Sequence, residues 1–424
     1  MNAGDAAILY AMMNVLRAAV GHDTQFIVYD KHGDVPNRYY PDVVFRKLLY
    51  LTRESRFVNR APGGWSRILR RLDDIRFRLG LRSIKNGIPL VPQVFLSSIE
   101  RRDLLEYKTA DLIVSSGGTY LVENYSLAAR VFDYQLSLYL ERPLAFFTQS
   151  LGPFSDPSNR KALLPIFDNS IAILVRDQKS RCNLIELGVD DAKVHLSADA
   201  AFALSDPEAL ESAKSHVARP GKRLRVVISV REWSHFKTIE PAQGMNQYTD
   251  ALRTLTQYLV KKHNAEITYL STCQGMPEYW TDDSRLAQKI VDGLSDKTRR
   301  SVSVDSSFHD PVALATTLKE YDLVIATRMH MAILALGVGI PVLPIAYEFK
   351  MQELFERLGQ GRWVHDIETV SGDGLIQRVN EFLEALPKMR ESIFTAVERE
   401  HGSAVASGQI VKQAFEEWRK TGKR

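Results

Sequence analysis

Short apolar segments alternate with amphipathic segments along most of this sequence, and this alternation constrains the fold more than any other feature. The apolar segments are rich in Val, Ile and Leu, as buried strands are. The amphipathic segments between them are long enough for helices that cross back over a sheet. The pattern therefore predicts β–α–β units and parallel sheets. The expected strands are 26–29, 111–115, 144–148, 171–175 and 193–196 in the first half, and 224–230, 266–271, 302–304, 323–326 and 342–346 in the second.

The chain is too long for one ordinary hydrophobic core. Its 424 residues favour two domains, and the strand pattern restarts after a polar stretch with Pro207, Pro220 and Gly221. We predict an α/β fold of two Rossmann-like, doubly wound domains with a cleft between them. The predicted parts are an N-terminal domain at 1–205, a linker at 206–222, a C-terminal domain at 223–380 and a helical tail at 381–424.

The first domain starts abruptly. The segment Asn2-Ala3-Gly4-Asp5 is typical of a loop between a strand and a helix, and a helix is expected directly after it, at 6–20. No strand precedes the loop, so either the start codon is misassigned or the predicted sheet lacks its usual first strand. Further helices are expected at 127–141, 179–187, 248–262 and 283–294, and from Leu375 to the end.

Composition narrows the class of protein. Apolar residues make up 45% and charged residues 25%, as in a soluble globular chain. The two cysteines, Cys182 and Cys273, lack the spacing of a zinc site and do not make a disulfide framework, so a reducing compartment is favoured. The N-terminus lacks a signal-peptide pattern. The longest uncharged run, 331–347, is interrupted by glycine and proline and is a poor membrane span. We expect a cytoplasmic protein.

Positive charge is concentrated in a segment that runs from Arg67 to Lys85. Seven basic residues stand there against Asp73 and Asp74, a formal charge of +5, and apolar residues lie between them at roughly helical spacing. A solvated surface helix explains this pattern. A face for an acidic membrane surface or an anionic lipid-linked substrate explains it equally well. No nucleic-acid recognition motif accompanies the charge, so a nucleic-acid partner is not expected.

Polar and cationic residues follow the predicted strands at the points where the strands end. Ligands of open parallel sheets bind outside the carboxyl ends of the strands, so these residues are expected to share one binding rim. They are Gly117 and Gly118, Gln149, Arg176, Asp199, Arg231, Arg328 with His330, and Lys350.

The sharpest group is Arg328, His330 and Lys350, which follow two successive strands of the second half. Two permanent cations and an imidazole at a helix start suit a phosphate or carboxylate ligand, and a histidine can exchange a proton near neutral pH. Each residue alone has a structural explanation. His330 can be a structural histidine, Asp199 a helix cap, and Gly117-Gly118 a tight turn that lacks the third glycine of a dinucleotide fingerprint.

In these motifs the chain resembles the polysaccharide pyruvyl transferase family, in the family's order, over about residues 2–360. The Arg-x-His segment with its following lysine is the most specific match. The matching motifs are Asn2 to Asp5, Gly117-Gly118, Gln149 to Phe154, Val175-Arg176-Asp177, Ser197-Ala198-Asp199, Ser229-Val230-Arg231, and Arg328 to Ala335 with Tyr347 to Lys350.

The resemblance implies a GT-B-like fold and transfer of pyruvyl from phosphoenolpyruvate to a sugar of a cell-surface or exported polysaccharide. It implies that Arg176, His330 and Lys350 are catalytic. The donor-binding candidates are Arg328, Arg231, Gly117, Gly118, Gln149 and Asp199. His330 would be the general acid or base, and the cations would hold the donor and the leaving phosphate. No metal or other cofactor is expected. The basic insertion at about 46–92 matches no family motif, and our hypothesis is that it forms an acceptor site or a membrane contact.

Two alternatives remain open at the level of sequence. A GT-B nucleotide-sugar glycosyltransferase is favoured by Glu348 and Glu356, whose separation is like that of paired glutamates in some such enzymes. A non-catalytic subunit of a polysaccharide assembly complex is the other, although the intact Arg328, His330 and Lys350 argue against it.

Overall fold

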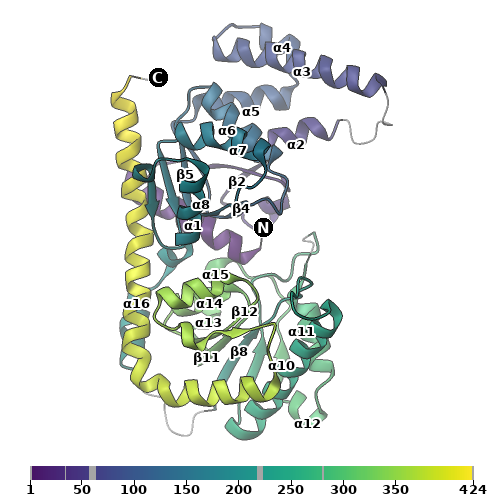
Figure 1. Ribbon diagram of the computed structural model, residues 1–424, viewed down its shortest axis with the longest axis vertical. Coiled ribbons are helices and arrows are strands. Elements are labelled where there is room, and N and C mark those ends of the chain that lie inside the picture. The colour runs from purple at the N-terminus through teal and green to yellow at the C-terminus, as the bar shows by residue number, and fades with distance from the viewer. Residues whose placement is uncertain (1, 34, 57–63, 217–222, 279–280, 423–424) are drawn as a thin grey trace. The chain divides into compact units, whose positions relative to one another are not determined.

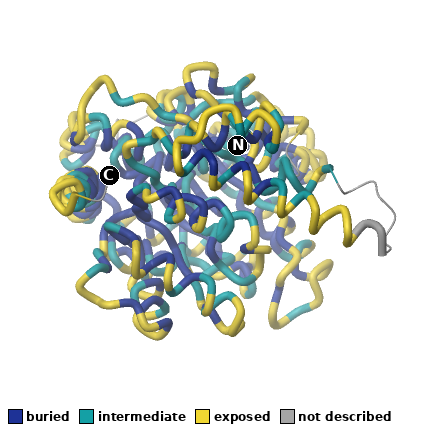
Figure 2. Tube along the Cα trace, turned by 90° about the horizontal axis from the view of Figure 1, so that it is seen from above, coloured by how far each residue is buried: buried dark blue, intermediate teal, exposed yellow. Residues whose placement is uncertain are grey.

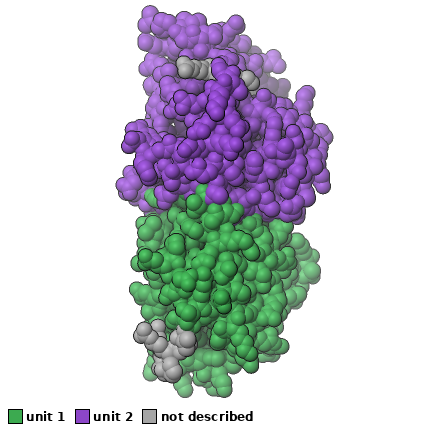
Figure 3. All heavy atoms as spheres, turned by 90° about the vertical axis from the view of Figure 1, so that its left-hand side faces the viewer, with its two compact units in different colours: residues 1–11, 199–405 green, residues 12–198, 406–424 purple. Residues whose placement is uncertain are grey.

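The computed structural model describes residues 2–33, 35–56, 64–216, 223–278 and 281–422. The chain forms two compact units, coloured separately in Figure 3. Unit 1 comprises Met1–Ala11 and Asp199–Val405, and unit 2 comprises Met12–Ala198 and Ala406–Arg424. The ends of the chain therefore differ from the predicted domains. Residues up to Ala11 belong to the unit that contains the second half of the chain, and residues from Ala406 belong to the unit that contains the first half.

Unit 1 contains a six-stranded parallel sheet with the strand order β10-β9-β8-β11-β12-β13 (Figure 1). In chain order this is 3-2-1-4-5-6, the order of a Rossmann sheet. The strands are β8 (Arg225–Ser229), β9 (Glu266–Tyr269), β10 (Val302–Val304), β11 (Leu323–Ala326), β12 (Val342–Ala346) and β13 (His365–Asp366). The helices include α9 (Pro207–Lys214), α10 (Pro241–His263), α11 (Asp283–Asp292), α12 (Asp296–Arg299), α13 (Pro311–Leu318), α14 (Met329–Gly337) and α15 (Phe349–Arg357).

Unit 2 contains a second parallel sheet with the order β3-β5-β6-β7, and β4 pairs with β5 beyond β3. These strands are β3 (Ile113–Ser115), β4 (Gly118–Leu121), β5 (Leu144–Leu151), β6 (Ala172–Val175) and β7 (Val194–Leu196). A separate parallel pair is formed by β1 (Ile27–Asp30) and β2 (Val44–Lys47). The helices are α2 (Leu49–Glu54), α3 (Gly64–Lys85), α4 (Val91–Phe95), α5 (Ser98–Thr109), α6 (Ala128–Tyr139), α7 (Pro157–Asp168) and α8 (Gln178–Leu187).

The central strands β5, β6, β11 and β12 are buried along their whole length. Figure 2 shows that the buried parts of the chain lie in the interior and the exposed parts at the periphery. This burial explains why the sequence shows them as continuous apolar runs rather than alternating ones. Each of the ten predicted strands coincides with an observed strand to within a few residues. The two doubly wound sheets confirm the predicted α/β class.

The strands β2, β4 and β13 were not expected. Each has four residues or fewer, and Gly118, predicted to lie in a turn, opens β4 with φ +129°. The predicted linker contains α9, and its remaining residues 217–222 lie outside the described residues, as do 57–63 of the basic insertion.

Helix α1 (Ala3–Val20) begins earlier than expected, so Asn2-Ala3-Gly4-Asp5 is a helix start rather than a loop. The side chain of Asn2 caps it, since its Oδ1 accepts the backbone N–H of Asp5 at 3.0 Å and its Nδ2 donates to Asp5 Oδ2 at 2.9 Å. By length and composition α1 could cross a membrane, but 61% of it is buried inside the folded chain. Burial of this kind is typical of a core helix in a water-soluble fold.

The last helix, α16 (Gly372–Lys420), extends through the predicted tail. Its first part belongs to unit 1 and its last part to unit 2, and α1 is divided between the two units in the same way.

Candidate active site

The strand order of unit 1 reverses between β8 and β11, and ligands of such sheets bind at this switch point. Arg231 follows β8, Arg328 follows β11, and Tyr347 follows β12. Because β8, β11 and β12 are neighbours in the sheet, the motifs after them meet at one edge. The expectation that these segments share a rim therefore matches the geometry within unit 1.

His330 lies in the first turn of α14, with its side chain 18% exposed. Its Nε2 atom is buried and forms no hydrogen bond with any residue that the structure describes. Asp199 Oδ2 lies 3.6 Å from that nitrogen. The other oxygen of Asp199 accepts the backbone N–H of Ala201 at 3.0 Å and caps the 3-10 helix Ala200–Leu204. Asp199 thus has a capping role and a place beside the histidine.

Gly4, in the first turn of α1, lies against the other ring nitrogen of His330. A Cβ atom at position 4 would stand 2.9 Å from His330 Nδ1 and 3.0 Å from its Cβ. Such contacts are too short for a side chain to be tolerated without movement, so the position requires glycine. The backbone N–H of Ala3 donates to the Thr272 carbonyl at 3.0 Å, which fixes the start of α1 on unit 1.

Arg328 is held by a bidentate ion pair with Asp283. Its Nε donates to Asp283 Oδ2 at 2.8 Å and its Nη2 to Oδ1 at 2.6 Å, and the Asp283 side chain is 0% exposed. Burial alone would lower the pKa of the Arg328 guanidinium, but the Asp283 carboxylate raises this pKa above its ordinary value. Ser271 also donates to Asp283, at 2.8 Å. The arginine predicted to bind the donor therefore also positions the start of α14.

Arg231 reaches across to the end of β12. Its Nη1 donates to the hydroxyl of Tyr347, and its guanidinium lies 4.1 Å from the centre of the Tyr347 ring and 5.2 Å from that of Trp233. Lys350, 20% exposed in the first turn of α15, lies 3.3 Å from Glu348 Oε2. The same sheet edge thus carries the cationic residues predicted for unit 1.

The two helices that follow β11 and β12, which are α14 and α15, lack side-chain caps. Neither Arg328, which precedes α14, nor Glu348, which precedes α15, accepts a hydrogen bond from the first turn. In contrast, Asp or Glu side chains cap α9, α10, α11 and α13 in the same unit, and Ser295 caps α12. The first amides of an uncapped helix are a ready site for an anion, so the α14 start suits a phosphate or carboxylate.

Unit 2 assembles the remaining predicted residues. Gly118 is the register partner of Gln149, and the backbone N–H of Arg176 donates to the Gln149 carbonyl at 3.1 Å. The Arg176 side chain is 7% exposed, donating to Ser150 Oγ at 2.8 Å and to Thr119 Oγ1 at 3.0 Å. Gln149 Oε1 is buried without a hydrogen-bond partner among the described residues. Gly117 precedes this strand edge.

Several residues of these clusters were not singled out as site residues from the sequence: Asp283, Tyr347, Trp233 and Gly4 among them. Asp283 follows another aspartate at a helix start, a pattern that predicts capping rather than a buried ion pair. Cys273 is buried, and burial raises the pKa of its thiol to about 12, so it stays protonated. No group of three or more His, Cys, Asp or Glu that could hold a metal is present among the described residues.

Two α/β units with parallel sheets, and with cationic side chains at the switch point of one of them, define an α/β protein of GT-B-like fold. Solved structures share this fold: a putative UDP-N-acetylglucosamine 2-epimerase from Listeria monocytogenes (TM-score 0.54, 14% identity, 98% of this chain and 95% of that chain) and the UDP-GlcNAc 2-epimerase from Neisseria meningitidis bound to UDP-GlcNAc (TM-score 0.54, 12% identity, 98% of each chain).

The sequence profile of the polysaccharide pyruvyl transferase family matches residues 2–348. This chain therefore belongs to that family and is a polysaccharide pyruvyl transferase, as the motifs indicated. A curated relative, the amylovoran biosynthesis protein AmsJ of Erwinia amylovora, is 25% identical over 300 residues, which cover 69% of this chain and 70% of AmsJ.

The Arg328–Asp283 pair generates a test of stability. Asp283→Asn removes the charge that compensates a buried guanidinium, so we expect a loss of about 3 kcal/mol in the free energy of unfolding. The control is Asp250→Asn, because Asp250 is 69% exposed in its pair with Arg253, and exposed pairs contribute below about 1 kcal/mol. Urea denaturation measures both. Equal shifts of the two midpoints would contradict the structural role of Asp283.

Proposed function

We propose that this enzyme transfers the pyruvyl group of phosphoenolpyruvate to a sugar of an exopolysaccharide, forming a ketal and releasing phosphate. Family membership supports the transfer, and AmsJ is named for the biosynthesis of amylovoran. The observation that carries the proposal is His330, whose buried Nε2 lies beside Asp199 at the uncapped start of α14. This arrangement combines an anion site with a proton donor.

The donor carries a phosphate and a carboxylate, and both need positive partners. In the proposal they bind the first amides of α14 and α15 together with Arg231 and Lys350. Arg328 contributes its Nη1 group, since its Nε and Nη2 atoms donate to Asp283. The guanidinium of Arg328 is thus oriented before the donor binds, which reduces the entropy lost when the donor binds.

The reaction adds a proton to the enol methylene of the donor, which becomes a methyl group. A sugar hydroxyl then attacks the neighbouring carbon, the carbon–oxygen bond to phosphate breaks, and a second hydroxyl closes the ketal. In this proposal the imidazole of His330, which has Asp199 Oδ2 3.6 Å from its Nε2, gives and takes the protons. No metal or other cofactor takes part in this scheme.

Arg176, with Gln149, Gly117 and Gly118, is assigned to unit 2, and its catalytic role is part of the proposal. Arg176 is anchored through Ser150 and Thr119, so its guanidinium is preorganised for an anionic group. We further propose that the enzyme works in the cytoplasm on a sugar or a lipid-linked oligosaccharide.

Replacement of His330 tests the proposal. We expect His330→Ala to lower the release of phosphate from phosphoenolpyruvate, with an oligosaccharide acceptor, by about a hundredfold or more, because general acid–base catalysis is lost. The matched control is His309→Ala: His309 is also 18% exposed and pairs with Asp305 at 2.8 Å in unit 1. We expect its turnover near that of the wild type. Mass spectrometry should show the pyruvyl mass on the acceptor.

The glycosyltransferase alternative makes a different forecast. In the structure Glu348 pairs with Lys350, and Glu356 accepts from Gln352 on the outside of α15, so these glutamates do not form a paired site of their own. Stabilisation by a nucleoside diphosphate, without stabilisation by phosphoenolpyruvate, in thermal unfolding would overturn the pyruvyl proposal in favour of this alternative.

The contact between Gly4 and His330 gives a second prediction. Gly4→Ala improves the helix propensity of α1 but places a methyl group 2.9 Å from His330 Nδ1. We therefore expect kcat to fall at least about tenfold through displacement of the ring. Gly402→Ala is the control, since Gly402 is helical in α16 and a Cβ there meets nothing within 4 Å. It should leave kcat unchanged. Equal activities of the two variants would contradict a positioning role for Gly4.

A further inference from the structure

Helix α3 in unit 2 turns an apolar stripe toward solvent. Ile68, Leu72, Ile75 and Leu79 recur at spacings of four, three and four residues, so they share one face of the helix. Their exposed fractions are 49%, 56%, 55% and 47%. A surface helix of a soluble protein normally buries such a stripe and exposes its charges. This helix therefore exposes the face that would be expected in a core.

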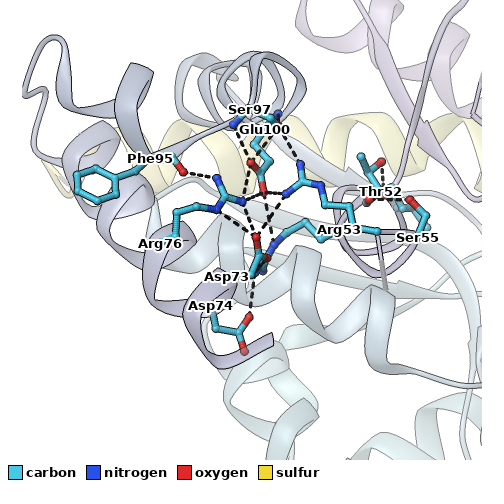
Figure 4. Close-up of polar contacts among 11 residues, drawn as sticks. Thr52, Arg53, Ser55, Asp73, Asp74, Arg76, Phe95, Ser97 and Glu100 are labelled. Carbon is cyan, nitrogen blue, oxygen red and sulfur yellow. Dashed lines mark hydrogen bonds and ion pairs between the residues drawn. The ribbon is translucent and has the colours of Figure 1, made fainter. Parts of the chain in front are cut away.

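The opposite face of α3 is fixed by a buried network of charges (Figure 4). Asp73 accepts from Arg53 at 3.0 Å and from Arg76 at 2.8 Å, and Arg76 also donates to Glu100 at 2.9 Å. Phe77 lies on the same side of the helix and is buried, and the Cζ atom of Arg53 lies 3.8 Å from the centre of its ring. The helix cannot roll its apolar stripe inward without breaking these contacts.

Glu100 of α5 is the centre of this network, and its side chain is 0% exposed. Burial alone would raise the pKa of the Glu100 carboxyl, but hydrogen bonds from Arg76, Ser97 and Arg56 outweigh burial and lower the pKa to about 2. The carboxylate is thus ionised at neutral pH and holds the arginines in place. The exposed stripe follows from this charged anchor.

A second stripe of α3 is basic. It consists of four arginines at spacings of four, seven and four residues: Arg67, Arg71, Arg78 and Arg82. The first three each directly precede a residue of the apolar stripe, and Arg82 lies three residues after its last member, Leu79. None of the four forms an ion pair within the part of the chain that the structure describes, and all four are exposed. Positive charge therefore lies alongside exposed apolar side chains, on one outward surface.

We propose that this surface, the α3 face made of the apolar stripe and the four arginines, docks on an anionic lipid membrane. A helix with this distribution lies in the plane of the interface, with its apolar face among the acyl chains and its cations at the lipid phosphates. Charge complementarity selects the occupant. A symmetric contact with a second copy would set arginines against arginines, and an Ile and Leu stripe offers no aromatic surface on which bases stack.

A pocket beside α3 has room for lipid headgroups. Its volume is about 650 Å³, and its lining includes the arginines Arg53, Arg70, Arg78 and Arg82, the carboxylates Glu54, Asp73 and Asp74, and the aromatic residues Tyr50, Phe132 and Tyr139. Two of the exposed arginines thus border both the pocket and the docking face. The pocket belongs to unit 2, whereas the candidate catalytic histidine belongs to unit 1, so it serves the membrane contact in this inference.

Vesicle co-sedimentation of the full chain tests the proposal. We expect binding to vesicles of phosphatidylglycerol mixed with phosphatidylcholine, and little binding to phosphatidylcholine alone. Arg71→Gln with Arg78→Gln should lower the partition coefficient roughly twenty-fivefold, since each basic residue near an anionic surface contributes roughly fivefold. Leu72→Ser with Ile75→Ser should lower it at least about tenfold through lost apolar burial.

Matched controls separate this surface from general changes in charge and hydrophobicity. Ile99→Ser with Leu105→Ser removes two apolar side chains of α5 that are 44% and 45% exposed. Lys31→Gln with Lys161→Gln removes two exposed cations elsewhere in unit 2. We expect both double variants to sediment like the wild type. Circular dichroism checks that every variant is folded.

A second measurement stays informative if the stripe variant does not fold. Ile75→Cys in a Cys182→Ser background, labelled with an environment-sensitive fluorophore, should shift its emission to the blue on anionic vesicles, and Leu105→Cys should not. No sedimentation of the wild type, equal binding to neutral vesicles, or an unshifted label would overturn the proposal. A dimer that the stripe variant dissociates would assign the face to a second copy instead.

This inference does not rest on the pyruvyl transfer reaction. With a soluble oligosaccharide acceptor, the α3 variants should release phosphate at the wild-type rate, because α3 contributes no residue to the candidate active site. Loss of vesicle binding with unchanged turnover supports the docking face by itself. Absent turnover of the wild type would count against the proposed reaction and leave the vesicle result standing.

Discussion

The buried pair of Arg328 and Asp283 is the interaction on which the candidate active site depends. It joins the start of α11 to the residue that precedes α14, and Ser271 links the same carboxylate to Ser229 at the end of β8. Three strand ends are thereby tied at the switch point of the Rossmann sheet. The pair sets the direction of the first turn of α14, and so decides where the imidazole of His330 and the free helix amides lie.

The positions of the strands could be predicted because buried parallel strands consist of continuous apolar residues in the sequence. Leu323–Ala326 is an example. The shared edge followed from the same rule, which collects the residues after each strand. Two contacts could not be predicted from the sequence: the one between Gly4 and His330 and the one between Asp283 and Arg328. Each joins residues that are far apart in the sequence, so neither produces a periodic pattern. For α3, periodicity showed two faces but not which one is buried.

The fold alone does not decide the chemistry of this enzyme. The epimerases with similar structures share 12% and 14% of their residues with this chain, so the likeness extends to the arrangement of the backbone only. What distinguishes this chain is the set of side chains at the carboxyl edge of unit 1. There an arginine backed by a carboxylate, an arginine stacked on Tyr347 and a histidine beside Asp199 occur together.

Helices α1 and α16 are each divided between the two compact units. Neither unit is therefore a contiguous stretch of chain, and a fragment cut between the halves would lack a helical segment that its own core requires. Synthesis from the ribosome leaves unit 2 incomplete until residues 406–420 have emerged. Unit 2 therefore receives its last helical segment only after residues 199–405 of unit 1 have been synthesised.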